Sequence, residues 1–219
     1  MGVWLLAASV LLVGCDRVYG LDAVENAVDA AGLDAPACVM PEQSDAFDAS
    51  EACSDWGYPL SGAAVEQLIG GELVLLPPAA GKNTGCVSKI PFGFGPSGVF
   101  VEVPAVGTGH FQYNSLQLFW NTQRTDSSSI GVTDMIRFTA HGSLLAELPY
   151  DPVSARWWRM RPSKGGVVAE FSADGRAWTL LGSDATAPPA ICMAQIQSGL
   201  ADGGSGATAM HVASFDVCP

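Results

Sequence analysis

Residues 155–181 read ARWWRMRPSKGGVVAEFSADGRAWTLL, and this stretch decides the fold class. Apolar and polar residues alternate in it with a period of two, which places successive side chains on opposite faces of a β-strand. Two dipeptides that favour tight turns, Lys164-Gly165 and Asp174-Gly175, interrupt the alternation. The sequence therefore predicts three antiparallel strands that are joined by two short hairpins.

The parity of the alternation predicts how these strands pair. A two-residue loop in the first hairpin pairs Trp158 with Phe171 and Arg159 with Glu170. A two-residue loop in the second pairs Phe171 with Trp178, whereas a three-residue loop would turn Trp178 to the other face. We expect two-residue loops because they keep the large apolar side chains together. The result is a buried aromatic row (Trp158, Phe171 and Trp178) backed by an outward ion pair.

Apolar runs separated by turn residues extend over most of the chain. They cover residues 72–76, 86–90, 98–103, 111–121, 134–139, 143–148, 155–161, 167–173, 176–181, 191–197 and 209–217. Short strands at this spacing, with almost no helical periodicity, are typical of an antiparallel sandwich or barrel. The tripeptide Ala140-His141-Gly142 is predicted to form a three-residue hairpin loop.

Three segments carry a resemblance to a known family. Residues 156–161 (RWWRMR) and 168–178 (VAEFSADGRAW) resemble late strands of concanavalin A-like lectin and glucanase domains, which are laminin-G-like jelly rolls, and residues 214–217 (SFDV) resemble the final strand. The resemblance spans residues 56–219 and implies an all-β, antiparallel two-sheet jelly-roll sandwich. We expect this concanavalin A-like domain at residues 55–219, after a signal peptide and a flexible tether. Such motifs indicate a fold and not a chemistry.

The N-terminal residues predict the compartment. Residues 3–13 form an apolar run that is too short to span a bilayer as a helix but fits a secretory signal. Residues 12–15 (LVGC) resemble the lipobox of bacterial lipoproteins, which implies a signal peptide at 1–14 and a lipidated Cys15 that anchors the protein to a membrane. No Lys or Arg precedes the run, which departs from the pattern. The alternative is a buried apolar segment with an unrelated cysteine.

Acidic residues are concentrated before the expected domain. From Met1 to Asp55 there are ten Asp and Glu residues against Arg17 alone, a net charge of −9, and the rest of the chain has a net charge of −3. Residues 15–54 have few large apolar side chains, so we expect an acidic disordered tether. No basic stripe is present, which argues against nucleic acid as a partner. The predicted location is the cell envelope outside the cytoplasm, on either membrane, and the oligomeric state stays open.

Besides Cys15, the chain has five cysteines: Cys38, Cys53, Cys86, Cys192 and Cys218. An oxidising compartment favours disulfides, and five cysteines allow two bridges and one unpaired thiol. We predict that Cys53 pairs with either Cys86 or Cys218. No two cysteines have Cys-x-x-Cys spacing, so a metal site is not predicted.

The sequence contains no catalytic motif that we recognise. The glucanase branch of the resembled family carries its acids as Glu-x-Asp-x-x-Glu on one strand, and this string does not occur. Glu102, Glu147 and Glu170 stand singly, as surface or paired charges. We therefore expect that the chain is not an enzyme and has no cofactor. The alternative is a calcium ion with oxygen donors from Asp126, residues 127–129, Asp134 and residues 202–204.

Two groups of side chains combine aromatic rings with planar polar groups, as sugar-binding surfaces do. The first consists of Tyr113, Gln117, Trp120 and Asn121, and the second, on an expected outward face, of Arg137, Trp157, Arg159 and Arg161. The alternative is that the tryptophans pack under loops and arginine stems cover them. The sequence thus predicts a membrane-anchored, non-catalytic binding or adhesion module for glycans. A polysaccharide-acting hydrolase with an unrecognised site and a structural envelope lipoprotein remain as alternatives.

Overall fold

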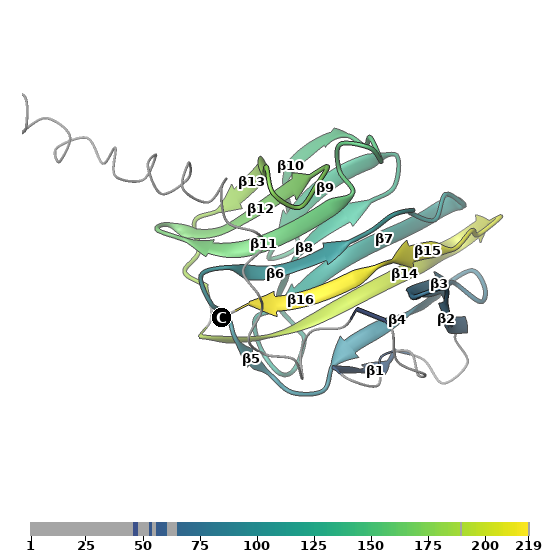
Figure 1. The fold of residues 1–219 in the computed structure, drawn as a ribbon, viewed down its shortest axis with the longest axis horizontal. Coiled ribbons are helices and arrows are strands. Elements are labelled where there is room, and N and C mark those ends of the chain that lie inside the picture. Colours follow the sequence, from purple (N-terminus) through teal and green to yellow (C-terminus); the bar gives the residue numbers. More distant parts are fainter. Residues whose placement is uncertain (1–45, 48–52, 54–55, 61–64, 189, 219) are drawn as a thin grey trace, which may run out of the picture. The chain divides into compact units, whose positions relative to one another are not determined.

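The computed structural model describes residues 46–47, 53, 56–60, 65–188 and 190–218, and all regular structure in these residues is β (Figure 1). The larger sheet contains, in this order, β1 (Gly57–Pro59), β4 (Lys82–Ser88), β14 (Ile191–Ser205), β7 (His110–Phe119), β8 (Ser127–Val132), β9 (Met135–Ala140) and β10 (Ser143–Pro149), with β5 (Phe92–Gly93) paired to β14. The smaller sheet contains β13 (Thr179–Asp184), β12 (Gly166–Ser172), β11 (Trp157–Ser163), β6 (Gly98–Glu102) and β16 (Ser214–Cys218). A third sheet joins β15 (Met210–Val212), β3 (Glu72–Leu76) and β2 (Val65–Ile69).

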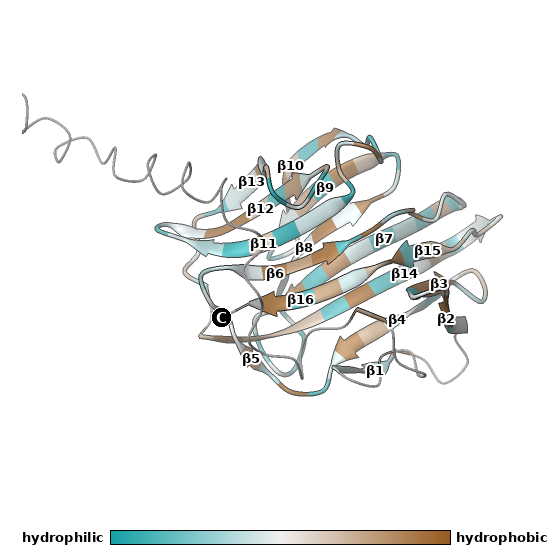
Figure 2. Ribbon diagram, viewed as in Figure 1, coloured by the Kyte–Doolittle hydropathy of each residue, from teal (hydrophilic) through white to brown (hydrophobic). Residues whose placement is uncertain are grey.

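The core lies between the two larger sheets, and the alternation of side chains puts it there. On β9, Ile136 and Phe138 are buried, while Arg137 between them is only half-buried. On β11 of the opposite sheet, Trp158 and Met160 have no exposed surface. Figure 2 shows the same alternation as hydrophobic and hydrophilic bands along the strands. The predicted antiparallel two-sheet sandwich is confirmed.

The first hairpin pairs as predicted. Trp158 lies opposite Phe171 and Arg159 opposite Glu170, and the pair of Ser163 with Gly166 leaves a two-residue loop. Burial of Trp158 is also as expected, and its indole Nε1 donates a hydrogen bond to the carbonyl oxygen of Ala155 at 2.8 Å. Local alternation and turn chemistry therefore suffice for this part of the fold.

The second hairpin does not pair as predicted, because Phe171 lies opposite Thr179 and not Trp178. Backbone N–H groups of the wider loop are bound by two side chains instead of closing a tight turn. Asp174 Oδ1 accepts hydrogen bonds from the amides of residues 176 and 177, and Ser172 Oγ accepts them from residues 174 and 175. Phe171 is only partly buried against the core, and Trp178 lies outside it, so the predicted buried aromatic row is wrong for Trp178.

A β-bulge in β13 restores the burial pattern after this loop. The register shifts by one residue on β13 between Ala169 and Glu170 of its neighbour β12. As a result Leu181 is buried and Leu180 is exposed. The bulge compensates for a loop length that the sequence pattern alone did not reveal.

The predicted three-residue loop at residues 140–142 is also wrong. Ala140 pairs with Ser143, so the loop consists of His141 and Gly142 only. Both residues have positive φ, 52° and 74°, as a type I′ turn requires. The sequence also missed β8, a serine-rich strand, and predicted one strand over residues 209–217 where β15 and β16 are separate.

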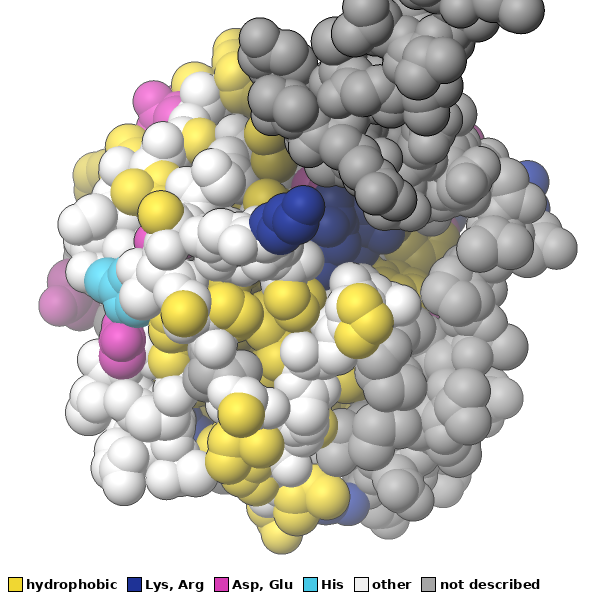
Figure 3. All heavy atoms as spheres, turned by 90° about the vertical axis from the view of Figure 1, so that its left-hand side faces the viewer, with side chains coloured by type: hydrophobic (Ala, Val, Ile, Leu, Met, Phe, Trp, Pro, Cys, Tyr) yellow, Lys and Arg dark blue, Asp and Glu magenta, His cyan; other side chains and the backbone are white. Residues whose placement is uncertain are grey.

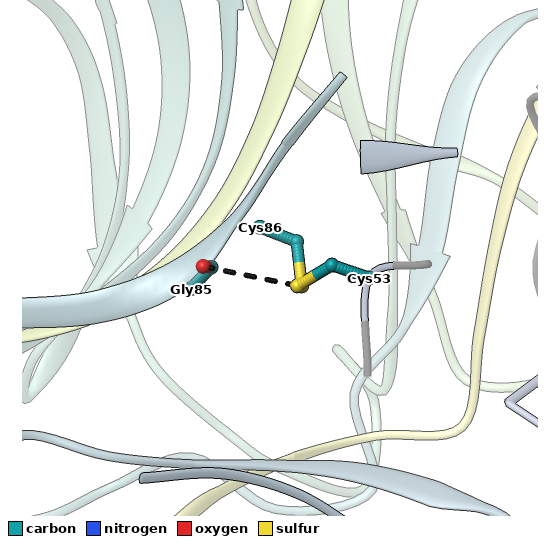
Figure 4. The surroundings of a disulfide bond; sticks show 3 residues. All are labelled: Cys53, Gly85 and Cys86. Atoms are coloured by element: carbon teal, nitrogen blue, oxygen red, sulfur yellow. Dashed lines mark hydrogen bonds between the residues drawn. A yellow bond between two sulfur atoms is a disulfide. The ribbon is translucent and has the colours of Figure 1, made fainter. Parts of the chain in front are cut away.

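A disulfide joins Cys53 to Cys86, which is one of the two predicted pairings, with Cα atoms 5.5 Å apart (Figure 4). Phe47 and Cys53, which precede the expected domain start at residue 55, are buried in the core. Cys192 is a free, buried thiol, and burial raises its pKa to about 12, which makes it unreactive. The predicted signal peptide, Cys15, most of the predicted tether, Cys38 and the side chain of Cys218 lie outside the described residues. Within those residues we find no helix of the length and apolarity that crossing a membrane requires.

Candidate functional site

A groove runs over the outer face of the larger sheet, across β14, β7, β8 and β9. Most residues that these strands turn toward the core are apolar, with Asn114, Ser128 and Ser198 among the buried polar exceptions. Their neighbours in the sequence point outward because side chains alternate along a strand. The outward side chains that line the groove include Tyr113, Ser115, Gln117, Ser129, Thr139 and Gln197. The surface is therefore built of amides, hydroxyls and one aromatic ring.

Gln197 on β14 is the centre of a hydrogen-bonded ladder that crosses three strands. Its Oε1 accepts hydrogen bonds from Asn83 Nδ2 at 2.9 Å and from Gln195 Nε2 at 2.8 Å. Its Nε2 donates to Ser115 Oγ on β7 at 3.2 Å. These bonds hold the amide planes in fixed orientations, so the polar groups are arranged before any ligand arrives.

The ladder continues on the other side of β7. Gln117 Nε2 donates to Ser127 Oγ at 2.8 Å, and the hydroxyl groups of Ser129 and Thr139 are 2.7 Å apart. Each of these groups keeps further donor or acceptor capacity, since a hydroxyl has two lone pairs and an amide has two N–H groups. Such a surface can bind a ligand that is rich in hydroxyl groups.

Tyr113 supplies the aromatic ring, and Gly199 makes room for it. A Cβ atom on Gly199 would lie only 2.2 Å from Cζ of Tyr113, so any larger residue there would displace the ring. Tyr113 is half-buried, and this burial raises the pKa of its hydroxyl, which stays protonated at neutral pH. The ring lies across β14 beside the amide ladder.

Charged side chains stand at one edge of the groove. Arg137 on β9 donates from Nε to a carboxylate oxygen of Glu147 and from Nη1 to Thr133 Oγ1 at 3.1 Å, and Asp134 Oδ1 lies 3.8 Å from its Nη2. A hydrogen bond from the Thr133 hydroxyl lowers the pKa of Asp134. Among the described residues that line the groove itself, Arg137 is the only charged one.

Three of the predicted ligand-binding residues, Tyr113, Gln117 and Arg137, meet in this groove. Trp120 instead packs against the core and donates from Nε1 to Ser128 Oγ at 2.9 Å. Asn121 binds Thr125 through both its amide groups and so shapes the loop before β8. The sequence missed Gln195, Gln197, Ser129 and Thr139, although the alternation of residues 127–132 is itself a strand signal.

The other predicted group is divided between the sheets. Trp157, Arg159 and Arg161 lie on β11 of the smaller sheet, whereas Arg137 lies on β9 of the larger one, so the predicted common face is wrong. Arg159 Nη2 and Arg161 Nη2 bind the two oxygens of Glu170 at 2.7 and 2.9 Å.

The Trp178 ring, which the sequence placed in the core, lies 4.0 Å from Cζ of Arg159. Burial lowers the pKa of Arg159, although Glu170 opposes the shift. Figure 3 shows one face of the molecule on which the largest group of Lys and Arg side chains lies beside hydrophobic ones.

The predicted calcium donors lie in different surroundings. Asp126 binds His141 Nδ1 at 2.8 Å, and Asp134 belongs to the cluster around Arg137. Across the part of the chain that the structure describes, no three His, Cys, Asp or Glu side chains are grouped to hold a metal ion.

No protein-family model and no curated protein matches this chain by sequence. Solved structures match its fold. A laminarinase from Flavobacterium sp. UMI-01 superposes with a TM-score of 0.61 at 11% identity, over 80% of this chain and 98% of that one. The Crh5 transglycosylase gives 0.58 at 15% identity, over 81% and 85%. The Bacillus licheniformis β-glucanase gives 0.57 at 10% identity, over 80% and 97%.

Each of these proteins is named as an enzyme, and this contradicts the expectation that a chain of this pattern is not one. The missing Glu-x-Asp-x-x-Glu string was the basis of that expectation, and the absence of one family's motif does not exclude activity. At these identities the likeness establishes the fold. The described part of the chain is a concanavalin A-like jelly roll, the fold that it shares with the glucanases.

Proposed function

We propose that the domain acts on a polysaccharide, binding a glycan chain in the groove of the larger sheet and cleaving it. The observation that carries the proposal is the groove lining, in which the Tyr113 ring lies beside oriented amides and hydroxyls. An aromatic face packs against the C–H groups of a sugar ring, and planar amides bind its hydroxyl groups. The fold shared with a laminarinase and a β-glucanase supports a glucan as the substrate.

The charge of the groove favours a neutral glycan. Arg137 is the one charged residue in its described lining, and Glu147 and Asp134 offset that charge. A polyanionic chain would meet both carboxylates and gain little from the guanidinium.

Cleavage in this proposal falls to Asp134 and Glu147. Glycoside hydrolysis generally uses two carboxyl groups that flank the scissile bond, and Arg137 contacts both of these side chains at the groove edge. The lowered pKa of Asp134, caused by the Thr133 hydroxyl, keeps this carboxylate ionised at neutral pH. An ionised carboxylate is what a base or nucleophile requires, and protonation of the leaving sugar's oxygen then falls to Glu147 as the general acid.

The test is to incubate the protein with a β-1,3-glucan and a mixed-linkage β-glucan, and to measure released reducing ends and bound glycan separately. Asp134→Asn and Glu147→Gln should each reduce turnover by about 100-fold and leave binding largely intact. Tyr113→Ala should weaken binding about tenfold. Asp202→Asn changes an exposed carboxylate outside the groove and serves as the control. No glycan binding by the unmodified protein would refute the proposal, and turnover unaffected by both substitutions would refute the assignment of the acids.

We also propose that acyl chains on Cys15 hold the protein on a membrane outside the cytoplasm. The Cys53–Cys86 disulfide supports this, since disulfides persist in oxidising compartments. Mass spectrometry of the mature N-terminal peptide from a bacterial host should find an acylated Cys15, and Cys15→Ser should abolish the modification and membrane association. An N-terminus that retains residues 1–14 without lipid would contradict the proposal.

A further inference from the structure

Asp134 lies in the turn between β8 and β9, and the bonds of this turn decide where its carboxylate stands. Thr133 donates from Oγ1 to Oδ1 of Asp134 at 2.7 Å. From one side, the N–H of Tyr150 donates to the carbonyl oxygen of Asp134 at 3.2 Å. On the other side, β8 ends at Val132, whose strand partner on β7 is Asn114. The place of the carboxylate therefore depends on how the end of β8 is held.

Asn114 holds the end of β8 from inside the sandwich. This side chain is fully buried, and its Nδ2 donates to the carbonyl oxygens of Val132 at 3.4 Å and of Gly107 at 2.9 Å. Its Oδ1 accepts from the N–H of Gly107 at 3.1 Å and from Ser198 Oγ at 2.9 Å. Both N–H groups and both lone pairs of the amide are used, so its plane is fixed. One side chain thus joins the end of β8 to residue 107.

Residues 107–109 face the turn across a hollow that Asp134 and Arg137 also line. The two bonds between Asn114 and Gly107 fix one wall of this hollow, and the bond to Val132 fixes the strand that leads into the other wall. The spacing of the two walls, and with it the place of Asp134, is therefore set by a group beneath the surface.

Gln112, two residues earlier on β7, has similar surroundings and different connections. It is 2% exposed, and its Oε1 accepts from the N–H groups of Gly109 at 2.8 Å and Thr208 at 3.0 Å. Its Nε2 donates to Ser198 Oγ at 3.0 Å and to the carbonyl oxygen of Thr208 at 2.6 Å. None of these four bonds reaches β8 or the turn that follows it. A comparison of the two amides can therefore separate support of residues 107–109 from placement of Asp134.

We propose that Asn114 is a positioning residue for cleavage, which holds the end of β8 against residues 107–109 and so fixes the Asp134 carboxylate. The inference rests on the proposed function and adds a residue that does not touch the substrate. Asn114 has no exposed surface, whereas Tyr113 and Ser115 on either side of it point into the groove. Its loss should therefore reduce turnover and leave glycan binding intact.

The test measures kcat, KM and the pH–rate profile of Asn114→Ala and Gln112→Ala, in the full chain, on the glucan that the unmodified protein cleaves. Each variant loses four hydrogen bonds, so the two melting temperatures should fall by similar amounts. Asn114→Ala should lower kcat about tenfold and change KM by less than about twofold, and Gln112→Ala should preserve both constants.

The pH–rate profile supplies a readout that a general loss of stability would not change. In Asn114→Ala, a displaced Asp134 loses the hydrogen bond from the Thr133 hydroxyl, which lowers the pKa of this carboxyl group. Loss of the bond raises that pKa, so the acid limb of the profile should move to higher pH. The acid limb of Gln112→Ala should stay in place.

If the alanine variants do not fold, Asn114→Ser and Gln112→Ser replace them. A serine hydroxyl at position 114 can bind the N–H of Gly107 but is too short to bridge to Val132 as well, so the same changes are expected.

The outcomes separate this inference from the function on which it rests. If the unmodified protein releases no reducing ends, the proposed function and the positioning role both fail. If it cleaves the glucan and the Asn114 variant keeps its kcat and acid limb, only the positioning role fails. Equal losses of kcat in the Asn114 and Gln112 variants also overturn that role, because they would reflect a general loosening of residues 107–109.

Discussion

The outer faces of the two sheets carry similar kinds of side chain but use them differently. On the smaller sheet, Arg159 and Arg161 share Glu170, and Trp178 covers Arg159. On the larger sheet, Gln197 and Ser115 are bonded to each other but also line an open groove. On the smaller sheet, these charged groups and the Trp178 ring contact one another. On the larger sheet, the amide and hydroxyl groups of the groove keep hydrogen-bonding capacity toward solvent. Composition alone does not distinguish a structural surface from a binding surface.

Removing the carboxylate of Glu170 on the smaller sheet should produce the largest loss of stability. Glu170→Gln leaves two arginines without their buried partner, so we expect a loss of about 3 kcal/mol in the free energy of unfolding, measured by urea denaturation. Glu102→Gln is the control, because its partner Arg156 is much more exposed and the loss should be below about 1 kcal/mol. Equal losses in the two variants would mean that the Glu170 cluster is not a buried network.

Gly199→Ala tests the larger sheet without removing a functional group. The added methyl group collides with the Tyr113 ring, so the ring should turn away and glycan affinity should fall by about tenfold, as for Tyr113→Ala. Gly93→Ala, where a Cβ atom meets nothing within 4 Å, should bind normally. Unchanged affinity in Gly199→Ala, measured by calorimetry, would exclude Tyr113 in this position as part of the site.

Trp178→Ala asks whether the aromatic and arginine side chains of the smaller sheet bind sugar. We expect a loss of about 1 kcal/mol in unfolding free energy from the stacking on Arg159, and no change in glycan affinity. Denaturation and calorimetry on the same sample measure both quantities. Weaker glycan binding would show that the two outer faces are not functionally distinct.

The smallest expected effect is on the pH dependence of stability. It concerns His141, which links the two sheets. Its Nδ1 binds Asp126, just before β8, and its Nε2 binds Asp184 at the end of β13, 3.0 Å away, while Trp120 packs edge-on against it. Burial alone would lower its pKa, but the two aspartates together raise it. A raised pKa means that protonation stabilises the folded state below about pH 6.5, and that this contribution disappears as the pH rises through the folded-state pKa.

We therefore expect the melting temperature of His141→Asn to fall furthest below that of the unmodified protein in acid. Asparagine tolerates positive φ, so the substitution preserves the turn and isolates the charge. The gap should narrow above neutral pH, and a gap that is constant with pH would contradict a charged bridge.

How far the sequence predicted the fold depended on whether the determining contacts are local. The pairing of β11 with β12 followed from alternation and a two-residue turn, both within one short segment. The next hairpin failed because Ser172 and Asp174 bind the loop backbone and a bulge follows. Of the candidate site, Tyr113, Gln117 and Arg137 were identified and the amides of β14 were missed.

On strands without a bulge, such as β9 and β11, the sequence by itself determined which side chains face outward, because the two-residue period of a strand is a property of the chain alone. On β13 the loop and the bulge overrode that period. Only the tertiary structure decided which of them meet. Gln197 contacts Ser115 because β14 lies beside β7 in the sheet, and Arg137 is separated from Arg159 because their strands belong to different sheets. Sheet order depends on how all strands together bury the core, a cooperative result that no single segment encodes.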